Sequence, residues 1–155
     1  MAIIQITTDF DAPIETVTKH ARTPKLLEYV TRGLVAFRPI NPPSFPDAWA
    51  ERDYRAELLL FGWLPIGKQT LGIEFLPPEA GKFFIRDNGH SATIKKWDHL
   101  VTLEALSDQK TRYTDQLELD AGWRTPVVGA FARYFYGYRQ KRWKRLIANG
   151  FDYAK

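Results

Sequence analysis

The chain has 155 residues, no cysteine and a formal net charge of +4. That length predicts one domain, residues 1–155, which buries roughly two thirds of the surface of its unfolded chain. The lack of cysteine excludes disulfide bonds, thiolate metal sites and a cysteine nucleophile, while the aromatic share of 14% supplies bulky side chains for a core or an apolar pocket.

The chain begins with a strand pattern. Residues 3–10 alternate between apolar and polar side chains, as in a strand with one buried face. Residues 1–5 lack the basic region and long apolar stretch of a signal peptide. No apolar run in the chain approaches the length of a membrane span. We therefore expect a cytoplasmic protein without a transmembrane helix.

Two short helices are predicted next. Asp11 and Pro13 mark the start of the first helix, which runs to about Ala21. Thr23-Pro24 starts the second, because threonine caps helix N-termini and proline suits the first helical position. Gly33 ends it.

A proline-rich loop follows a short strand over residues 34–40. The stretch 39–46 carries four prolines and cannot join the interior of a sheet. The loop also carries Phe45, so it is either a lid at a cavity mouth or a plain connector.

Two long strands are predicted after this loop. The first runs from Ala50 to Leu64, and a turn at Pro65 and Gly67 leads into the second. By alternation, one face of the first strand consists of Tyr54, Ala56, Leu58 and Leu60. One face of the second strand consists of Gln69, Leu71, Ile73 and Phe75. Turns are predicted at residues 77–81 and at Asn88-Gly89.

For the short strand between these two turns, residues 82–87, the pattern does not decide which alternate residues face the interior. Arg86 therefore either enters the interior, where it would pair with an acidic ligand, or lies on the surface. Residues 94–106 and 111–120 alternate clearly. Their apolar faces consist of Trp97, His99, Val101 and Leu103 in the first and Tyr113, Asp115, Leu117 and Leu119 in the second.

The last segment, Arg124 to Lys155, predicts one long amphipathic helix with Pro126 near its start. Its main apolar stripe consists of Val127, Phe131, Phe135 and Tyr138, at helical spacing. A second patch, rotated from the first, consists of Trp143, Leu146 and Ile147. This patch packs on the sheet edge or meets a partner or a membrane.

This helix also carries the positive excess of the chain. Seven basic residues and no acidic residue lie between Arg124 and Arg145, while the other 15 basic residues are outnumbered by 18 acidic ones. Cations near a helix C-terminus offset its macrodipole and keep an exposed face soluble. Contact with acidic lipid headgroups is an alternative. Nucleic acid is not an expected partner, because such a domain usually carries a wider basic footprint.

The order of elements is a strand, two short helices, about six strands and a long helix. Helices segregated from an antiparallel sheet indicate an α+β fold. No repeat or interdomain linker is evident.

Five local patterns carry a family resemblance. They are Asp11-Ala12-Pro13-Ile14-Glu15-Thr16-Val17, Phe61-Gly62-Trp63-Leu64-Pro65-Ile66-Gly67, Trp97-Asp98-His99, Tyr113-Thr114-Asp115-Gln116-Leu117-Glu118-Leu119 and Phe135-Tyr136-Gly137-Tyr138-Arg139-Gln140-Lys141-Arg142. With the order of elements they resemble the START/Bet v 1-like (SRPBCC, helix-grip) superfamily, as an uncharacterised member of the polyketide cyclase/dehydrase-like type.

The resemblance implies a helix-grip fold, in which a curved antiparallel sheet of about seven strands surrounds a long C-terminal helix. Two short helices follow the first strand, and a cavity lies between sheet and helix. Members of the superfamily bind lipids, sterols, polyketides or plant hormones, and some are aromatases or cyclases. Fold alone does not choose among these functions.

His99 and Asp115 are the polar groups that stand out on apolar strand faces. If the two strands form a hairpin, Asp115 lies opposite Val101 or opposite Leu103. In the first register it is diagonal to His99, roughly 7–8 Å away at the backbone, and the two side chains can meet. Such a pair either orients a ligand, acts in acid/base catalysis, or is a buried polar pair satisfied by its neighbours.

The sequence shows no site for a metal or a cofactor. His20 and His90 are expected on the surface, Asp98 and His99 point to opposite faces of one strand, and no glycine-rich phosphate loop is present. We therefore expect no cofactor.

The leading hypothesis is a protein that binds an apolar or amphipathic small molecule, such as a lipid, a polyketide or an aromatic compound. The expected ligand-binding residues are Tyr54, Leu58, Gln69, Ile73, Trp97, His99, Asp115, Phe131, Phe135 and Tyr138. The alternatives are a cyclase or dehydratase that uses His99 and Asp115, and a membrane-surface or interaction module that uses the basic helix. The sequence does not indicate an oligomeric state.

Overall fold

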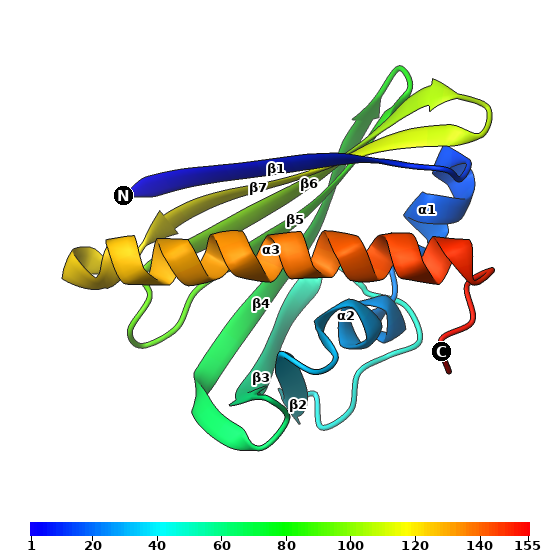
Figure 1. Cartoon of the computed structure of the whole chain (residues 1–155). Coiled ribbons are helices and arrows are strands. Elements are labelled where there is room, and N and C mark those ends of the chain that lie inside the picture. The colour runs from blue at the N-terminus through cyan, green and yellow to red at the C-terminus, as the bar shows by residue number, and fades with distance from the viewer.

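The computed structural model describes all 155 residues as a seven-stranded antiparallel sheet crossed by one long helix (Figure 1). The strands are β1 (Ala2–Phe10), β2 (Val35–Asn41), β3 (Arg52–Leu60), β4 (Leu64–Glu79), β5 (Lys82–Gly89), β6 (Lys96–Ser107) and β7 (Lys110–Asp120). The helices are α1 (Ile14–Ala21), α2 (Pro24–Thr31), the 3-10 turn η1 (Gly122–Arg124) and α3 (Thr125–Ala148).

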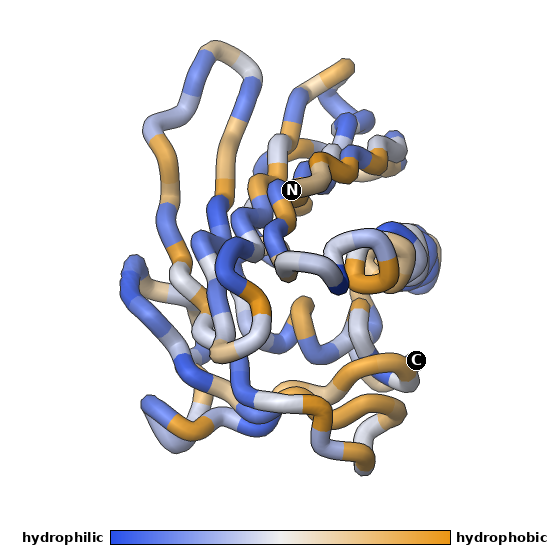
Figure 2. The backbone as a smooth tube through the Cα atoms, turned by 90° about the vertical axis from the view of Figure 1, so that its left-hand side faces the viewer, coloured by the Kyte–Doolittle hydropathy of each residue, from blue (hydrophilic) through white to orange (hydrophobic).

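The strand order is β1-β7-β6-β5-β4-β3-β2, so β1 closes one edge beside the last strand. Figure 2 looks nearly along α3 and shows the strands curving around it on one side. The helices α1 and α2 lie together at the end of the sheet near the C-terminus of α3 (Figure 1). The predicted α+β helix-grip fold, with two short helices after the first strand, is confirmed.

The turn between β3 and β4 lies earlier than predicted. Residues 61–63 form it, with Phe61 at φ 55° and Gly62 at φ 83°. Pro65 belongs to β4, beside a register shift between Leu58 and Leu59. The prediction failed because proline was taken as a turn signal, whereas an irregular ladder also accepts a residue that has no N–H.

The same reason explains the next boundary. Pro77 and Pro78 lie inside β4, where the register with β5 shifts between Leu76 and Glu79. The predicted turn at Asn88-Gly89 is also wrong, because β5 continues through Gly89, which lies opposite Trp97 of β6.

The long helix ends sooner than predicted. Asn149 follows the last residue of α3, and Gly150 and Phe151 both have positive φ values of 75° and 62°. These left-handed residues stop the helix and turn the last segment back toward α1. Phe151 stacks on His20 of α1, with ring centroids 4.1 Å apart.

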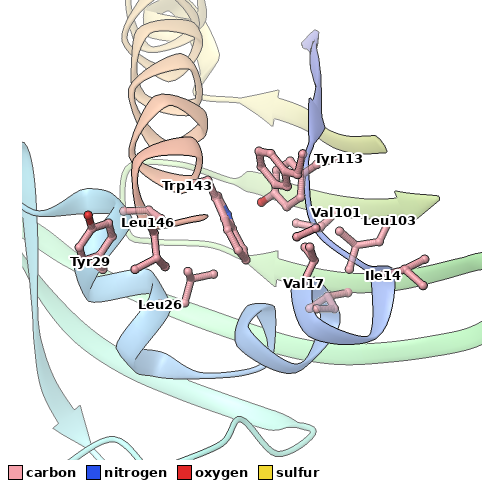
Figure 3. Packing of buried hydrophobic residues seen from close by; sticks show 13 residues of the cluster. Ile14, Val17, Leu26, Tyr29, Val101, Leu103, Tyr113, Trp143 and Leu146 are labelled. Carbon is pink, nitrogen blue, oxygen red and sulfur yellow. The ribbon is translucent and has the colours of Figure 1, made fainter. Parts of the chain in front are cut away.

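The C-terminal half of α3 is packed into the largest buried cluster. Trp143 and Leu146 are fully buried against α1, α2 and the sheet. Figure 3 shows Trp143 between the labelled side chains of α2 and those of the sheet. Trp143 and Leu146 of the second apolar patch therefore pack inside the protein and are not available to a partner or a membrane.

The N-terminal half of α3 packs on the sheet through only part of its predicted apolar stripe. Its buried positions are Ala132, Phe135 and Tyr136, which pack on β1, β2 and β7. Val127 is 76% exposed and Phe131 36% exposed, so the start of the stripe is not part of the buried core. Figure 1 shows the first turns of α3 extending past the ends of the neighbouring strands, where no sheet covers them.

None of the helices combines the length and the apolar character that a membrane crossing requires.

Replacing Trp143 by alanine should lower the free energy of unfolding by about 3–5 kcal/mol, because the substitution leaves a large cavity in a closed core. Chemical denaturation followed by circular dichroism measures this change. Trp123 is 89% exposed, and its replacement by alanine serves as the matched control, with an expected change below about 0.5 kcal/mol. Equal midpoints for the two variants would contradict the assignment of Trp143 to the core.

Candidate functional site

A cavity of about 440 Å³ lies between the sheet and α3. Of the 30 residues that line it, 21 are hydrophobic. They come from β2 to β7, from α1, α2 and α3, from residues 91–94, and from Thr23 and Trp49 in two connecting segments. A volume in this range is typical of sites for small molecules.

Most of the predicted site residues form the wall of this cavity. Those that line it are Leu58, Gln69, Ile73, Trp97, His99, Phe131 and Phe135. They share the cavity because alternate residues of neighbouring strands point to the same face of a sheet. Their role in binding a ligand stays a prediction.

Tyr54 and Tyr138 do not line the cavity, and this part of the prediction is wrong. Tyr54 packs behind Trp49, with ring centroids 4.7 Å apart, and its hydroxyl accepts a hydrogen bond from the N–H of Ala50 at 2.9 Å. Tyr138 is turned toward the end of α2, where its hydroxyl donates to the carbonyl of Arg32. Both side chains therefore contact the protein beside the cavity and do not form part of its wall.

His99 and Asp115 meet directly. Asp115 lies opposite Val101, so the first of the two registers is present, and His99 Nε2 is 2.7 Å from Asp115 Oδ1. The same oxygen accepts from the hydroxyl of Tyr113 at 3.2 Å, and Oδ2 accepts from Gln140 Nε2 at 3.0 Å. Asp115 is 1% exposed and stands behind His99, so its prediction as a residue of the cavity wall is wrong as well.

The charges of this pair follow from its surroundings. Burial lowers the pKa of His99 below its ordinary value, although Asp115 opposes this shift. Burial alone would raise the pKa of Asp115, but His99, Arg139 and Gln140 more than offset that effect and lower it. The pair is therefore a neutral imidazole that donates from Nε2 to a carboxylate, which leaves Nδ1 as a hydrogen-bond acceptor.

The free nitrogen of His99 has no partner in the protein, and the ring lines the cavity. The ring lies 4.6 Å from that of Tyr136, whose hydroxyl accepts from Trp97 Nε1 at 3.1 Å. His99 is thus held on two sides while Nδ1 stays available to accept a proton or a hydrogen bond from a bound molecule.

The strand of undecided parity faces the cavity with Ile85 and Asp87. Arg86 points to the outer face, where its guanidinium lies 2.8 Å from Asp98 Oδ2 and 3.1 Å from Glu74 Oε2. Arg86 therefore does not enter the cavity.

Asp87 is an acidic cavity residue that the sequence analysis missed. Its Oδ1 accepts from the N–H of Gly72 at 2.8 Å. Burial raises the pKa of Asp87 from 3.8 to about 7, although Gly72 and Arg139 oppose this shift. A signal was present, because Asp87 pairs with His99 across β5 and β6, and directly paired residues share a face.

Arg139 is the second missed residue. It lines the cavity and is 9% exposed, whereas the sequence analysis counted it with the exposed basic face of the helix. The signal was its position one turn after Phe135, on the same face of α3.

The other groups considered from the sequence lie apart from the cavity. His90 is exposed, but His20 is half-buried and its Nδ1 lies 2.6 Å from the hydroxyl of Tyr153, which corrects its expected surface position. Phe45 of the proline-rich loop packs on Trp49, which does line the cavity. The role of this loop as a lid stays a prediction. No three His, Asp or Glu side chains lie close enough together to hold a metal ion.

Replacing Asp87 by asparagine should change the dependence of stability on pH. Because the pKa of Asp87 is raised to about 7 in the folded chain, the stability associated with its bound proton is present at low pH and is lost as the pH rises from about 4 through about 7. Asparagine keeps an acceptor for Gly72 without titrating. The free energy of unfolding of Asp87→Asn, relative to that of the wild type, should therefore rise by about 2 kcal/mol between pH 5 and pH 8.

Denaturant unfolding at the two pH values measures this difference. The variant Asp108→Asn, at an exposed turn, is the matched control and should show no such rise. A pH-independent difference between Asp87→Asn and the wild type would show that Asp87 does not titrate in this range.

Comparisons with known proteins identify the family and the fold. Residues 47–147 match the family described as Domain of unknown function (DUF8410). No curated protein matches the chain.

Several solved structures have the same architecture over nearly the whole chain. A conserved protein from Geobacillus kaustophilus has a TM-score of 0.64 at 16% identity, with 96% of each chain covered. A START superfamily protein from Mycobacterium smegmatis has a TM-score of 0.62 at 13% identity, covering 95% of this chain and 97% of that one. Norcoclaurine synthase from Thalictrum flavum has a TM-score of 0.64 at 8% identity, covering 96% and 87%.

At these identities the likeness establishes the fold and carries over no activity. The neighbours show that the resemblance to START/Bet v 1-like proteins is one of fold. With about two thirds of its length matched by the family model, the chain belongs to the family described as Domain of unknown function (DUF8410), and it has a START/Bet v 1-like fold.

Proposed function

We propose that this protein binds a small, mainly apolar molecule in the cavity between the sheet and α3. The observation that carries the proposal is the cavity itself, about 440 Å³ with 21 hydrophobic residues among the 30 that line it. Transfer of apolar surface from water into such a cavity contributes roughly 25 cal/mol per Å². A cavity that exists before binding also reduces the cost of ordering the protein around its ligand.

The ligand is amphipathic rather than wholly apolar. Among the apolar side chains the wall presents His99, Gln69, Asp87 and Arg139. A few polar groups of this kind fix the orientation of a ligand whose affinity comes mostly from apolar contact. Lipids, polyketides and aromatic compounds all combine these two properties.

The ligand enters at the end of the cavity near the start of α3. Ile66 of β4 is 48% exposed and Val127 of α3 is 76% exposed, and both line the cavity. The exposed residues 92 and 93, in the loop between β5 and β6, line it as well. Side chains that face both the solvent and the cavity mark its mouth.

The fold is compatible with this function. The neighbour norcoclaurine synthase is a structure in complex with dopamine and hydroxybenzaldehyde. At 8% identity it supports binding of a small molecule by this fold, and it supports no particular ligand for this chain.

The two alternatives have less support. In a catalytic pair, Asp115 would orient His99 and raise its basicity, and the hydrogen bonds of Asp115 are compatible with that role, but burial lowers the pKa of His99 despite them. That arrangement favours holding His99 in place. In the basic helix, Arg142 donates to the carbonyl of Tyr29 at 3.1 Å and so is used within the protein.

Filling the cavity should abolish binding. N-Phenyl-1-naphthylamine is a neutral apolar dye whose fluorescence rises in apolar sites, and the wild type should bind it with one saturable site. Leu58 is half-buried in the cavity wall, and Leu58→Trp should weaken binding by about tenfold or more, because the larger ring takes space that the dye needs. Fluorescence titration measures the affinity.

Leu106 is 39% exposed and lies outside the cavity, so Leu106→Trp is the matched control and should bind like the wild type. If Leu58→Trp does not fold, the smaller change Ile73→Phe takes its place. If a folded variant with the larger side chain at Leu58 or Ile73 binds the dye as tightly as the wild type, the proposal is wrong. Native mass spectrometry of freshly purified protein, searched for a retained small molecule, is the independent measurement.

A further inference from the structure

Arg139 presents a buried charge that the protein leaves without a partner. The residue is 9% exposed, in the part of α3 that crosses the cavity. Its Nε has no hydrogen-bond partner. None of the ion pairs in the chain includes it. Buried arginines are normally paired with an acid, because an unpaired charge away from water is costly.

The aromatic rings beside Arg139 do not replace such a partner. The guanidinium carbon lies 5.2 Å from the ring centroid of Tyr136 and 5.6 Å from that of Phe135. A cation near an aromatic face gains about 0.5–2 kcal/mol. That gain is small beside the several kcal/mol that desolvation of an ion costs. The rings hold the planar group in place without satisfying its N–H donors.

The two acids near Arg139 are engaged elsewhere. Both carboxylate oxygens of Asp115 accept hydrogen bonds from side chains, including those of His99 and Gln140. Asp87 Oδ1 accepts from the N–H of Gly72. Both acids lie close enough to act on the guanidinium through their charge, since they help to raise the pKa of Arg139 against the opposing effect of burial. Arg139 therefore stays protonated, and the cavity that it lines is the place where a counter-ion could reach it.

A second donor lies in the same wall. Gln69 is 7% exposed, lines the cavity and makes no side-chain hydrogen bond within the protein. A methyl group placed on Gly89 would lie 2.9 Å from Gln69 Nε2 and 3.2 Å from Asp87 Oδ1. The absence of a side chain at Gly89 thus lets these two polar groups lie near one another. A protonated Asp87 adds a third donor to this part of the wall.

We propose that the cavity binds the carboxylate of an amphipathic acid, with Arg139 as its counter-ion and Gln69 as a further hydrogen-bond donor. This inference rests on the proposed function and names the chemical class of its ligand. A guanidinium matches a carboxylate with two parallel N–H···O bonds, and such charge-assisted pairs are about twice as strong as neutral ones. A single negative charge suits the site better than a doubly charged phosphate, because the carboxylate of Asp115 lies nearby.

The test compares two ligands of the same shape that differ in charge. Biphenyl-4-carboxylate and biphenyl-4-carboxamide have the same rings and nearly the same head group, and isothermal titration calorimetry at neutral pH measures the affinity of each. The wild type should bind the carboxylate about tenfold more tightly than the amide. Arg139→Met keeps the apolar stem without the charge, and it should reduce this ratio to about one.

The controls separate the charge of Arg139 from its volume and from the general charge of the helix. Arg139→Lys keeps the charge without the planar pair of donors, and its ratio should fall between those of the wild type and Arg139→Met. Arg133 is exposed on the same helix, and Arg133→Met should keep the wild-type ratio. Thermal unfolding of each variant verifies that it is folded. Loss of an unpaired buried charge should not lower the melting temperature of Arg139→Met.

The outcomes distinguish this inference from the function on which it rests. Equal affinities of the wild type for the two ligands overturn the carboxylate site, while binding of the neutral amide still supports an apolar pocket. A preference for the carboxylate that persists in Arg139→Met also overturns it, since another group then holds the anion. Failure of both ligands to bind a protein that binds N-phenyl-1-naphthylamine overturns the carboxylate site alone. Failure of all three overturns both proposals.

Discussion

The attachment of α3 to the sheet at two separate places is the constraint from which the cavity follows. Near its C-terminus the helix is held by Trp143 and Leu146, and nearer its N-terminus by Ala132, Phe135 and Tyr136. These side chains belong to two different buried clusters. The turn between them carries Arg139 and Gln140, which are buried although they are polar. The α3 residues that line the cavity lie between Val127 and Arg139, so the packing of Trp143 and Leu146 closes the cavity at the end away from its mouth and holds the helix across the curved sheet.

Gln140 shows how this polar turn is joined to the sheet. Its Nε2 donates to the carbonyl of Ile6 at 2.8 Å and to Asp115 Oδ2 at 3.0 Å, so one side chain links α3 to β1 and to β7. Asp115 in turn holds His99 through a 2.7 Å hydrogen bond. The position of His99 in the cavity therefore depends on the position of the helix. A buried polar network is stable only when each of its members has hydrogen-bond partners, and Asp115 has three side-chain donors.

The strands were predictable because one face of the sheet is buried. In β6 and β7 the alternation of Trp97, His99, Asp115 and Leu117 with polar residues identified the inward face correctly. The register of this hairpin remained open between two alternatives. It depends on the turn and on the irregularity between Ala105 and Ser107, and neither leaves a hydrophobic pattern in the sequence.

The boundaries that failed have local causes. Pro65 and Gly67 look like a turn in the sequence, yet the left-handed residues are Phe61 and Gly62. A phenylalanine with positive φ is uncommon and has no sequence signal. The end of α3 failed for a similar reason, since apolar and aromatic residues continue past Asn149 although the backbone turns there.

Asp87 and Arg139 were missed for a more general reason. Periodicity assigns residues to a buried face by their apolar character, and it treats a charged residue as exposed unless the strand or helix pattern is strong enough to override this. Asp87 lies in a short strand whose parity was undecided, and Arg139 lies among seven basic residues. Arg139 is buried and Asp87 is half-buried, and withdrawing either charge from water costs free energy. For Asp87 the cost appears as a pKa raised to about 7, which lets the group become neutral.

Arginine has no such route, because its guanidinium does not lose its proton in a protein. A buried arginine must find an anion within the fold or receive one from outside. Asp115 is already bonded to three side-chain donors, and the ion pairs of the other acids in the chain do not include Arg139. The same turn of α3 thus contains Gln140, whose amide is bonded to the sheet, and Arg139, which lines the cavity and whose Nε has no partner in the protein. A helix that satisfies one of two adjacent polar residues within the protein and leaves the other facing an apolar cavity is organised around a molecule that carries the opposite charge.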